Sequence, residues 1–416
     1  MGQIIIDGGC PLRGELEIQS AKNSVLPILA AAILCGDVCR IEKCPRLTDV
    51  ECAGEILRHL GAQAYWEGRD FVVDSGTLTG AEIPEYLMRK MRSSVIFLGA
   101  ILGRCGECRL SYPGGCELGP RPIDLHLDAL RALGAEITEG GGLLNCTAQQ
   151  LRGEHVVLAI PSVGATENAM LCAVNARGTT VISNAAREPE IVDLQNFLQK
   201  MGANVSGAGG DTITVVGGAP LHGCSHRCIG DRIVASTYLC AAAATMGDVT
   251  LRGVDPAHLS TVLSALRNAG STLTVRQDLI RLESEERLRS VPTIRTSPYP
   301  GFPTDAQAVL MAAMLKCRGT TVFVENIFES RYGHVSELRR MGAHISVEGR
   351  VAVVSGTEHL YGARVQCPDL RGGAALVIAG LQAQGQTVIT LTHHIERGYE
   401  NITEDLSALG AAIRRS

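Results

Sequence analysis

The chain has 416 residues, a length that allows two to four domains, and its 45% hydrophobic content supports packed cores and argues against a disordered regulator. Lys and Arg total 38 against 43 Asp and Glu, a net charge of −5 without a basic block, which argues against a protein that coats nucleic acid. The longest apolar stretch, residues 24–35, is too short to span a bilayer, and no secretory leader opens the chain. We therefore expect a cytoplasmic globular protein.

A short phrase, Leu-x-x-(Leu/Met/Ala)-Gly-(Ala/Ser), recurs six times in chain order. Its glycines lie 68 to 73 residues apart, at Gly61, Gly134, Gly202, Gly270, Gly342 and Gly410. Each phrase is typical of an amphipathic helix that a glycine ends, and the alternating residues after it, as in 136–138 and 344–347, predict a half-buried strand. Six occurrences at nearly constant spacing favour a repeated unit over coincidence.

The segments between the phrases complete the unit. Strands are predicted at 179–183, 321–325 and 387–392, and Ala/Leu-rich helices at 166–176, 235–245 and 306–315. Each unit therefore contains two helices and several strands, near βαβαββ. Because a unit of about 70 residues buries too little surface to be stable alone, we predict an α/β protein with two domains of three units each.

The domain boundary is expected in residues 217–230, where Gly, Pro and polar residues are typical of a connection. Residues 1–19 precede the first helix, which opens at Ser20–Lys22, and by symmetry they would add strands to the second domain. The predicted domains are residues 20–229, and residues 1–19 together with 230–416. Two such domains would suit an enzyme that closes over charged substrates.

The fifteen cysteines are an odd, dispersed set without framework spacing, which suits thiols that fill apolar space in a reducing compartment. Cys105 and Cys108 form a lone CxxC motif without a second pair, which is weak support for a metal site. Alternating His and Cys residues occupy 222–228, but along an extended segment of roughly 20 Å they could not close a tetrahedron. We predict no metal site.

Four features could carry chemistry. Ser20 would cap a helix whose first turn contains Lys22. The Lys22 ammonium and the free amides of the helix start would together attract an anion. Cys116 lies in a loop rich in Gly and Pro, close to Arg121 and Asp124, and would be more exposed and more reactive than a core thiol.

Asp305 follows three prolines and opens an apolar helix, which would position one carboxylate as a general base, although an acidic residue in a first turn is as often a helix cap. Four arginines lie near the ends of helix-like segments and could together bind carboxylate or phosphate; they are Arg92, Arg331, Arg371 and Arg397.

Together these residues resemble the UDP-N-acetylglucosamine enolpyruvyl transferases. The resemblance runs from Gly8-Gly to the last Leu-Gly-Ala and rests on Lys22-Asn23, the Cys116–Asp124 loop, Ser162–Thr166, Asn184–Glu190, Phe302–Asp305, Asp369–Arg371 and Arg397-Gly-Tyr. It implies a pair of inside-out α/β barrels, as in 5-enolpyruvylshikimate-3-phosphate synthase. It also implies the first committed step of peptidoglycan synthesis, in the cytoplasm, with phosphoenolpyruvate and a UDP-sugar as substrates and no cofactor.

The same resemblance assigns roles to single residues. Lys22, Arg121 and Arg397 would bind phosphoenolpyruvate, with Asn23 at the reacting centre and Arg331 and Arg371 completing the anion-binding shell. Asp305 would take the proton of the sugar 3-hydroxyl, and Cys116 would act as the acid and be alkylated by fosfomycin. The UDP-sugar would be held by Arg92, Arg121, Pro122, Ile123, Asp124, Leu125, Ser162, Val163, Gly164 and Ile327.

The chain departs from the family at several positions. Gln19-Ser20 replaces Ser-Gly before Ala21, Val234 and Ser236 replace a glutamate and a glycine beside the predicted hinge, Pro120 replaces alanine, and Gly-Gly follows Arg371. Three alternatives stay open: a transferase acting on shikimate 3-phosphate, which lacks the loop cysteine; a UDP-sugar-binding regulator with little turnover; and a relative of RNA 3′-phosphate cyclase, which the acidic charge disfavours.

Overall fold

A computed structural model of the chain describes residues 2–112 and 123–416. Contacts divide these residues into two compact units, one of residues 2–19 and 230–416 and the other of residues 20–112 and 123–229. None of the helices in the described ranges has both the length and the apolar composition that a membrane span requires.

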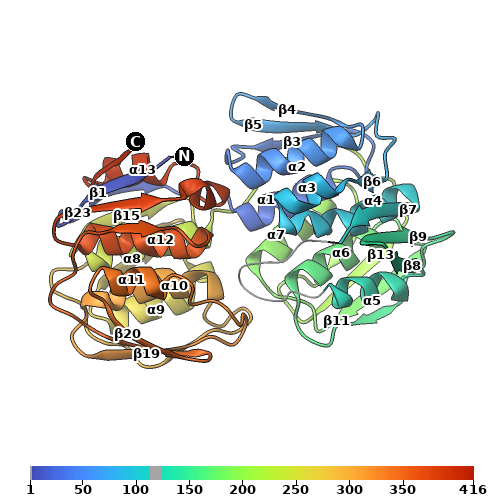
Figure 1. Cartoon of the computed structure of the whole chain (residues 1–416). Coiled ribbons are helices and arrows are strands. Elements are labelled where there is room, and N and C mark those ends of the chain that lie inside the picture. The colour runs from blue at the N-terminus through green and yellow to red at the C-terminus, as the bar shows by residue number, and fades with distance from the viewer. Residues whose placement is uncertain (1, 113–122) are drawn as a thin grey trace. The chain divides into compact units, whose positions relative to one another are not determined.

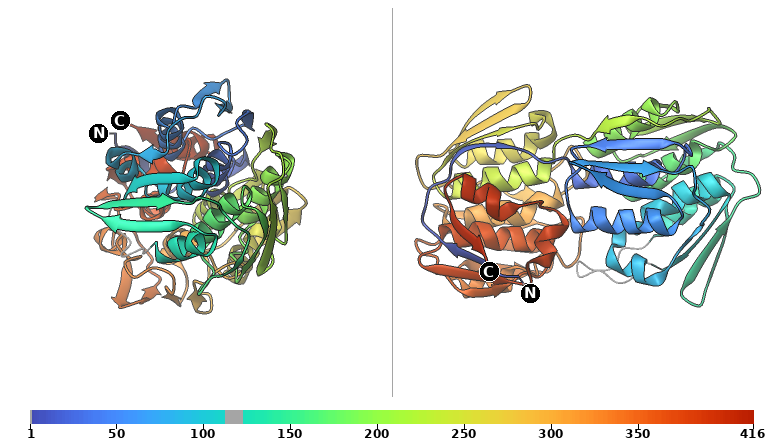
Figure 2. Two further views of the ribbon diagram at one scale, coloured as in Figure 1. Left: turned by 90° about the vertical axis from the view of Figure 1, so that its right-hand side faces the viewer. Right: turned by 90° about the horizontal axis from the view of Figure 1, so that it is seen from above.

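The unit of residues 2–19 and 230–416 consists of helices inside and strands outside (Figures 1 and 2). Its α-helices are α8 (Arg232–Ala244), α9 (Ser260–Asn268), α10 (Thr304–Ala313), α11 (Val335–Arg340), α12 (Leu370–Gln382) and α13 (Ile402–Ala408). Short 3-10 turns are η2 (Pro256–Leu259), η3 (Met314–Lys316) and η4 (Thr392–Arg397). Its strands are β1 (Ile4–Asp7), β2 (Arg13–Glu17), β15 (Asp248–Arg252), β16 (Thr272–Arg276), β17 (Leu279–Glu283), β18 (Ile294–Arg295), β19 (Thr320–Val324), β20 (His344–Glu348), β21 (Val351–Ser355), β22 (Arg364–Gln366), β23 (Gln386–Thr390) and β24 (Ala412–Arg415).

The unit of residues 20–112 and 123–229 has the same plan. Its helices are α1 (Lys22–Ala31), α2 (Thr48–His59), α3 (Glu85–Lys90), η1 (Arg92–Ile96), α4 (Phe97–Cys105), α5 (Asp124–Ala132), α6 (Val163–Ala173) and α7 (Pro189–Lys200). Its strands are β3 (Val38–Glu42), β4 (Gln63–Glu67), β5 (Asp70–Asp74), β6 (Glu82–Ile83), β7 (Glu107–Ser111), β8 (Glu136–Gly140), β9 (Leu143–Thr147), β10 (His155–Val157), β11 (Gly178–Ser183), β12 (Asn204–Ser206), β13 (Thr212–Gly217) and β14 (Ser225–Arg227).

The strands form six four-stranded sheets, with the orders β14-β3-β5-β4, β6-β7-β9-β8, β10-β11-β13-β12, β2-β15-β17-β16, β18-β19-β21-β20 and β22-β23-β1-β24. Each sheet has one parallel pair followed by two antiparallel pairs. The segment before the first helix supplies β1 and β2 to two of these sheets. A mixed α/β fold of six repeats is therefore confirmed.

Three central helices, α8, α10 and α12, contact one another in the first unit. In α12 every residue from Arg371 to Gln382 is buried, because a helix that is apolar on all sides is stable only when other elements surround it. In Figure 1, α10 and α12 lie between the sheet of β19 and β20 and the sheet of β1 and β23. The predicted helices at 235–245 and 306–315 are thus confirmed as core helices.

The six repeated glycines end six helices as predicted. Their φ angles lie between 91° and 108°, in the left-handed region that favours glycine, and a strand follows each of them within a few residues. Glycine is also required where strands cross the ends of helices. A Cβ atom on Gly217 would lie 2.1 Å from the carbonyl oxygen of Ala176, and one on Gly356 would lie 1.7 Å from that of Cys317.

One local expectation is incomplete and one is wrong. Residues 217–230, expected as a connection, also contain β14, which pairs in parallel with β3. Ser20 does not cap α1: the residue before the helix is Ala21, and the Ser20 hydroxyl instead donates to the carbonyl oxygen of Lys43 at 3.1 Å. Since a capping side chain must stand directly before the first helical residue, Ser20 lies one position too early.

Candidate active site

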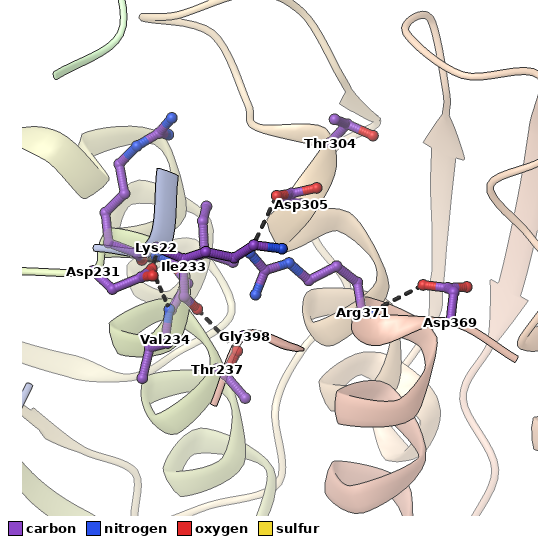
Figure 3. Close-up of polar contacts among 12 residues, drawn as sticks. Lys22, Asp231, Ile233, Val234, Thr237, Thr304, Asp305, Asp369, Arg371 and Gly398 are labelled. Carbon is purple, nitrogen blue, oxygen red and sulfur yellow. Dashed lines mark hydrogen bonds and ion pairs between the residues drawn. The ribbon is translucent and has the colours of Figure 1, made fainter. Parts of the chain in front are cut away.

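Asp305 lies between two arginines at the start of α10 (Figure 3). Its Oδ1 accepts a hydrogen bond from Nη2 of Arg331 at 2.8 Å, and its Oδ2 accepts one from Nη2 of Arg371 at 3.2 Å. The side chains of the two arginines are 2% and 4% exposed, whereas that of Asp305 is 30% exposed. The carboxylate is therefore fixed by two buried cations and still reaches the surface of this unit.

Arg371 is held in turn by the start of α12 and by Tyr399. Asp369 caps α12 by accepting hydrogen bonds from the amides of Arg371 and Gly372, and Nη1 of Arg371 donates to the Tyr399 hydroxyl at 3.4 Å. Burial acts to lower the pKa of Arg371, but Asp305, Tyr399 and Asp231 together outweigh burial and raise that pKa. Arg371 therefore stays cationic inside the unit.

A buried carboxylate, Glu325, fixes the approach to Asp305. It is 1% exposed and accepts hydrogen bonds from the hydroxyls of Thr296 and Thr304, at 2.9 and 3.0 Å. It also accepts from the amides of Ile327 and Phe328, at 2.8 and 3.1 Å. One carboxylate therefore joins the first residue of α10 to the segment that follows β19.

In the other unit, Lys22 is the first residue of α1 and Asn23, half-buried, is the second. The Lys22 ammonium forms an ion pair with Asp49, in the first turn of α2, with 2.5 Å between Nζ and Oδ2. Both residues are buried, with Lys22 8% and Asp49 1% exposed. The predicted cation at a helix start is confirmed, and Asp49 is the anion that holds it in this position.

Asp193, on α7, ties α1 to the region of β14. It accepts hydrogen bonds from the Ser24 hydroxyl at 2.7 Å, from Nε2 of His226 at 2.9 Å and from the amide of Ile229 at 3.2 Å. Among the described residues, Asp193, His226 and Cys228 are also the one group with three metal-type ligand atoms within 4.8 Å of one another. Because the carboxylate already accepts three hydrogen bonds, we interpret the group as a structural network that positions Ser24 beside Asn23.

The starts of α5 and α6 lie together. Asp124 begins α5 after the buried Ile123, and Ser162 caps α6 by accepting a hydrogen bond from the amide of Ala165. A Cβ atom on Gly164 would lie 2.7 Å from the His126 ring, so only glycine permits this approach. Two helix N-termini, whose first amides have no acceptor within their own helices and therefore favour anions, thus neighbour each other, together with Leu125 and Val163.

The remaining predicted residues are placed as follows. Arg92 begins η1, Ile327 is 38% exposed after β19, and Arg397 is half-buried at the end of η4. Cys116, Arg121 and Pro122 lie outside the described residues. The structure therefore brings together Asp305, Arg331 and Arg371 in one unit, and describes Lys22 and Asn23 in the other.

The departures at Val234 and Ser236 are absorbed within α8. Asp231 caps this helix by accepting from the amides of Ile233 and Val234, the Val234 side chain is 1% exposed, and the Ser236 hydroxyl donates to the carbonyl oxygen of Arg232 at 2.6 Å. An apolar residue at 234 is buried without an unpaired charge. These substitutions leave the start of α8 intact (Figure 3).

Three supporting residues were not predicted: Asp49, Glu325 and Tyr399. Asp49 could have been suspected from its place in the first turn of an amphipathic helix, where acidic residues are favoured. The Glu325 carboxylate meets Thr304 across 21 positions of sequence and the Tyr399 hydroxyl meets Thr237 across 162, and no local pattern indicates either contact.

Residues 6–406 match the family model described as EPSP synthase (3-phosphoshikimate 1-carboxyvinyltransferase). The chain is 49% identical, over 100% of both chains, to UDP-N-acetylglucosamine 1-carboxyvinyltransferase 2 of Caldanaerobacter subterraneus subsp. tengcongensis. The chain belongs to the enolpyruvyl transferase family, among the UDP-N-acetylglucosamine 1-carboxyvinyltransferases.

One further relative and two solved structures are also similar to this chain. The enzyme of that name from Clostridium tetani, numbered 2, is 45% identical over 100% of both chains. The crystal structure of the enolpyruvyl transferase NikO from Streptomyces tendae superposes with a TM-score of 0.89, at 27% identity, over 100% of this chain and 99% of that one. EPSP synthase from Acinetobacter baumannii, at 19% identity with a TM-score of 0.76, shares the fold over 100% of each chain.

Proposed function

We propose that this enzyme transfers the enolpyruvyl group of phosphoenolpyruvate to the 3-hydroxyl of UDP-N-acetylglucosamine and releases phosphate, the first committed step of peptidoglycan synthesis. Identity of 49% to a UDP-N-acetylglucosamine 1-carboxyvinyltransferase along the whole of both chains carries the proposal. The name of that relative gives a single nucleotide sugar as substrate and no nucleic acid, which agrees with a chain of net charge −5 without a basic block.

The proposed base is Asp305. In the addition step its carboxylate takes the proton of the 3-hydroxyl while that oxygen forms a bond to C2 of phosphoenolpyruvate. Arg331 and Arg371 fix both carboxylate oxygens, at 2.8 and 3.2 Å, so the base is oriented before the substrate arrives. Their positive charges also favour the anionic groups of phosphoenolpyruvate near Asp305.

The proposed acid is Cys116, whose thiol would donate a proton to the methylene carbon as C2 is attacked. In the elimination step the Cys116 thiolate takes a proton back from that carbon of the tetrahedral adduct, the C2–O bond to phosphate breaks, and phosphate leaves. Lys22, Arg121 and Arg397 would bind the phosphate and carboxylate of phosphoenolpyruvate, with Asn23 at the reacting centre. Neither substrate is oxidised overall, so the chemistry requires no redox cofactor.

The neighbouring starts of α5 and α6 would receive the UDP-sugar. Their unpaired amides suit the diphosphate, through Ile123–Leu125 and Ser162–Gly164, with Arg92, Arg121, Pro122 and Ile327 as further contacts. We further propose that the two compact units are the three-repeat domains of residues 20–229, and of residues 1–19 with 230–416. We also propose that the enzyme acts in the cytoplasm.

Phosphate release from phosphoenolpyruvate tests the function directly. We expect release that requires UDP-N-acetylglucosamine, that does not occur with shikimate 3-phosphate, and that stops after treatment with fosfomycin. Absence of release while UDP-N-acetylglucosamine still binds would reject the transferase in favour of a UDP-sugar-binding regulator.

Variants test the roles of single residues. Asp305→Asn is isosteric and should lower kcat by about 10²–10⁴-fold, while the Kd for UDP-N-acetylglucosamine changes little. Cys116→Ser should also lose turnover and become insensitive to fosfomycin. Glu286→Gln, which changes a carboxylate that is 69% exposed, is the matched control and should keep full activity. Full activity in Asp305→Asn would exclude Asp305 as the base.

A further inference from the structure

Three cysteines meet where β3 and β14 pair, outside the residues assigned to the reaction. Cys39 lies on β3, Cys35 lies four residues before it, and Cys224 directly precedes β14. The Sγ atoms of Cys35 and Cys39 are 3.8 Å apart. None of the three is in a disulfide.

The parallel pairing brings Cys224 to the same place. Ser225 of β14 is opposite Arg40 of β3, and the Arg40 amide donates to the carbonyl oxygen of Cys224 at 2.9 Å. Cys224 is therefore in register with Cys39, and the two thiols lie close enough to affect each other's pKa. Cys39 is the central thiol, with a partner in its own loop and a second across the sheet.

A metal ion does not explain this cluster. A tetrahedral zinc site requires all its ligand atoms around one ion, with zinc–sulfur distances of about 2.3 Å. Over the described ranges, the one group of three or more such ligand atoms within 4.8 Å of each other is Asp193, His226 and Cys228. The three thiols thus form a chain centred on Cys39 and do not surround a common point.

The outer and central thiols differ in access and in acidity. Cys35 and Cys224 are half-buried, whereas Cys39 is buried. The hydrogen bond with Cys39, helped by the Asp37 backbone and the Ser75 hydroxyl, lowers the pKa of Cys35 to about 6 against the cost of burial. The neighbouring thiols of Cys224 and Cys35, together with burial, raise the pKa of Cys39. Cys35 is therefore the thiol of this bonded pair that an oxidant reaches first, because it is the more exposed of the two.

We propose that Cys35 and Cys39 form a thiol-oxidation site, in which hydrogen peroxide converts the pair into a disulfide. The Cys35 thiolate attacks one oxygen of the peroxide, the O–O bond breaks, and the departing hydroxide takes a proton to become water. The Cys39 thiol then attacks the sulfur of the Cys35 sulfenic acid, the S–O bond breaks, and a second water leaves with the proton of Cys39. Two thiols lose two electrons and the peroxide gains them.

Cys224 gives this disulfide an internal exchange partner. Its thiolate can attack the Cys39 sulfur, which forms a Cys39–Cys224 bond and releases Cys35 as a thiolate, with no further oxidant. This exchange would fasten β3 covalently to β14. A thiol reductant reverses both steps.

Peptide mapping of the full-length enzyme tests the site. Trypsin cleaves after Lys and Arg, so Cys35 and Cys39 fall together in residues 23–40 and Cys224 falls in residues 201–227. After brief treatment with hydrogen peroxide and alkylation of the remaining thiols, we expect the first peptide to lose two hydrogens and both alkyl groups. Longer treatment should add the cross-linked pair of peptides, and reductant should restore both free peptides.

Two variants and one control complete the experiment. Cys39→Ser should prevent formation of the disulfide and leave Cys35 as a sulfenic acid, which a 1,3-diketone reagent traps. Cys35→Ser should slow the oxidation of Cys39 by about tenfold or more. Cys10→Ser, which removes an exposed thiol elsewhere, should change neither. If Cys35 and Cys39 remain fully alkylated while Cys10 is oxidised, or if Cys39 bonds to Cys224 without passing through Cys35, the proposed pair is wrong. The wild-type mapping decides this even if a variant does not fold.

Discussion

Replacing Asp193 with alanine should strongly destabilise the unit of residues 20–112 and 123–229. The carboxylate is 3% exposed and accepts from Ser24, His226 and the Ile229 amide at 2.7, 2.9 and 3.2 Å. A buried donor left without an acceptor costs about 1–3 kcal/mol. Two buried donors, Ser24 and His226, and the half-buried Ile229 amide would lose their acceptor. Because a buried charge is also removed, which offsets part of this cost, the expected loss in the free energy of unfolding is about 4 kcal/mol.

The single tryptophan of the sequence makes this loss measurable in the correct unit. Trp66 lies on β4, its ring centroid is 4.8 Å from that of Phe71, and its Nε1 donates to Glu51 at 2.7 Å. Its fluorescence therefore reports unfolding of this unit alone. With a urea slope of about 2–3 kcal/mol per molar, the expected loss moves the midpoint down by about 1.5 M.

The matched control is Asp211→Ala in the same unit. Asp211 pairs with Arg187 at 3.1 Å on the surface, with a side chain that is 63% exposed, and a pair of this kind contributes about 0–1 kcal/mol. Ser24→Ala, which removes one donor and keeps the carboxylate, should cost about 1 kcal/mol. A midpoint for Asp193→Ala no lower than that for Asp211→Ala would refute the role of Asp193 as the buried acceptor.

Three further predictions concern packing and protonation. Gly217→Ala should lower the free energy of unfolding of its unit by about 2–3 kcal/mol, because a Cβ atom would lie 2.1 Å from a backbone carbonyl oxygen. Urea unfolding followed by Trp66 fluorescence measures this loss. The control Gly140→Ala, whose Cβ atom would have nothing within 4 Å, should leave the free energy of unfolding unchanged. Tyr238→Phe removes the hydroxyl that donates a hydrogen bond to Asp405. Hydrogen exchange of the α8 amides should therefore become faster, which corresponds to a loss of about 1 kcal/mol in the free energy of opening. Unchanged exchange would contradict a stabilising role for this hydrogen bond. Burial lowers the pKa of His334 to about 4, so His334 is neutral when folded and its unfolded form binds the proton more readily. Stability of its unit should therefore be lost as the pH falls from about 6.5 to about 4, and His334→Leu should flatten that slope in hydrogen exchange.

Local patterns in the sequence were sufficient to predict the repeat and most of the helices and strands. A glycine that ends a helix is required by backbone geometry alone, so six helix ends could be read from six phrases, and all six glycines have positive φ. The apolar helices at 235–245 and 306–315 were equally clear, because their composition leaves them no stable place but the core. Ser20 was misjudged because an N-cap depends on a single position, which a pattern locates less well than a whole helix.

In the candidate site, too, the sequence indicated single residues but not the contacts between them. Asp305 and the arginines could be selected from residue type and from their place at the ends of predicted elements. Their pairing could not: Arg331 and Arg371 reach Asp305 from 26 and 66 positions away, and Glu325 and Tyr399 support them through contacts equally remote in sequence. The same holds for Asp193, whose partners Ser24 and His226 lie 169 and 33 positions from it.

The sequence by itself determined that this protein is a six-fold α/β repeat with cations, a carboxylate and a thiol at the ends of its elements, since those features depend on neighbouring residues. The tertiary structure alone decided which charges meet, which carboxylates are buried as acceptors, and that three cysteines converge beside β3 and β14. The physical reason is that hydrogen bonds and ion pairs act over about 3 Å in space, and the packing of distant repeats, not the local chain, sets which groups come that close.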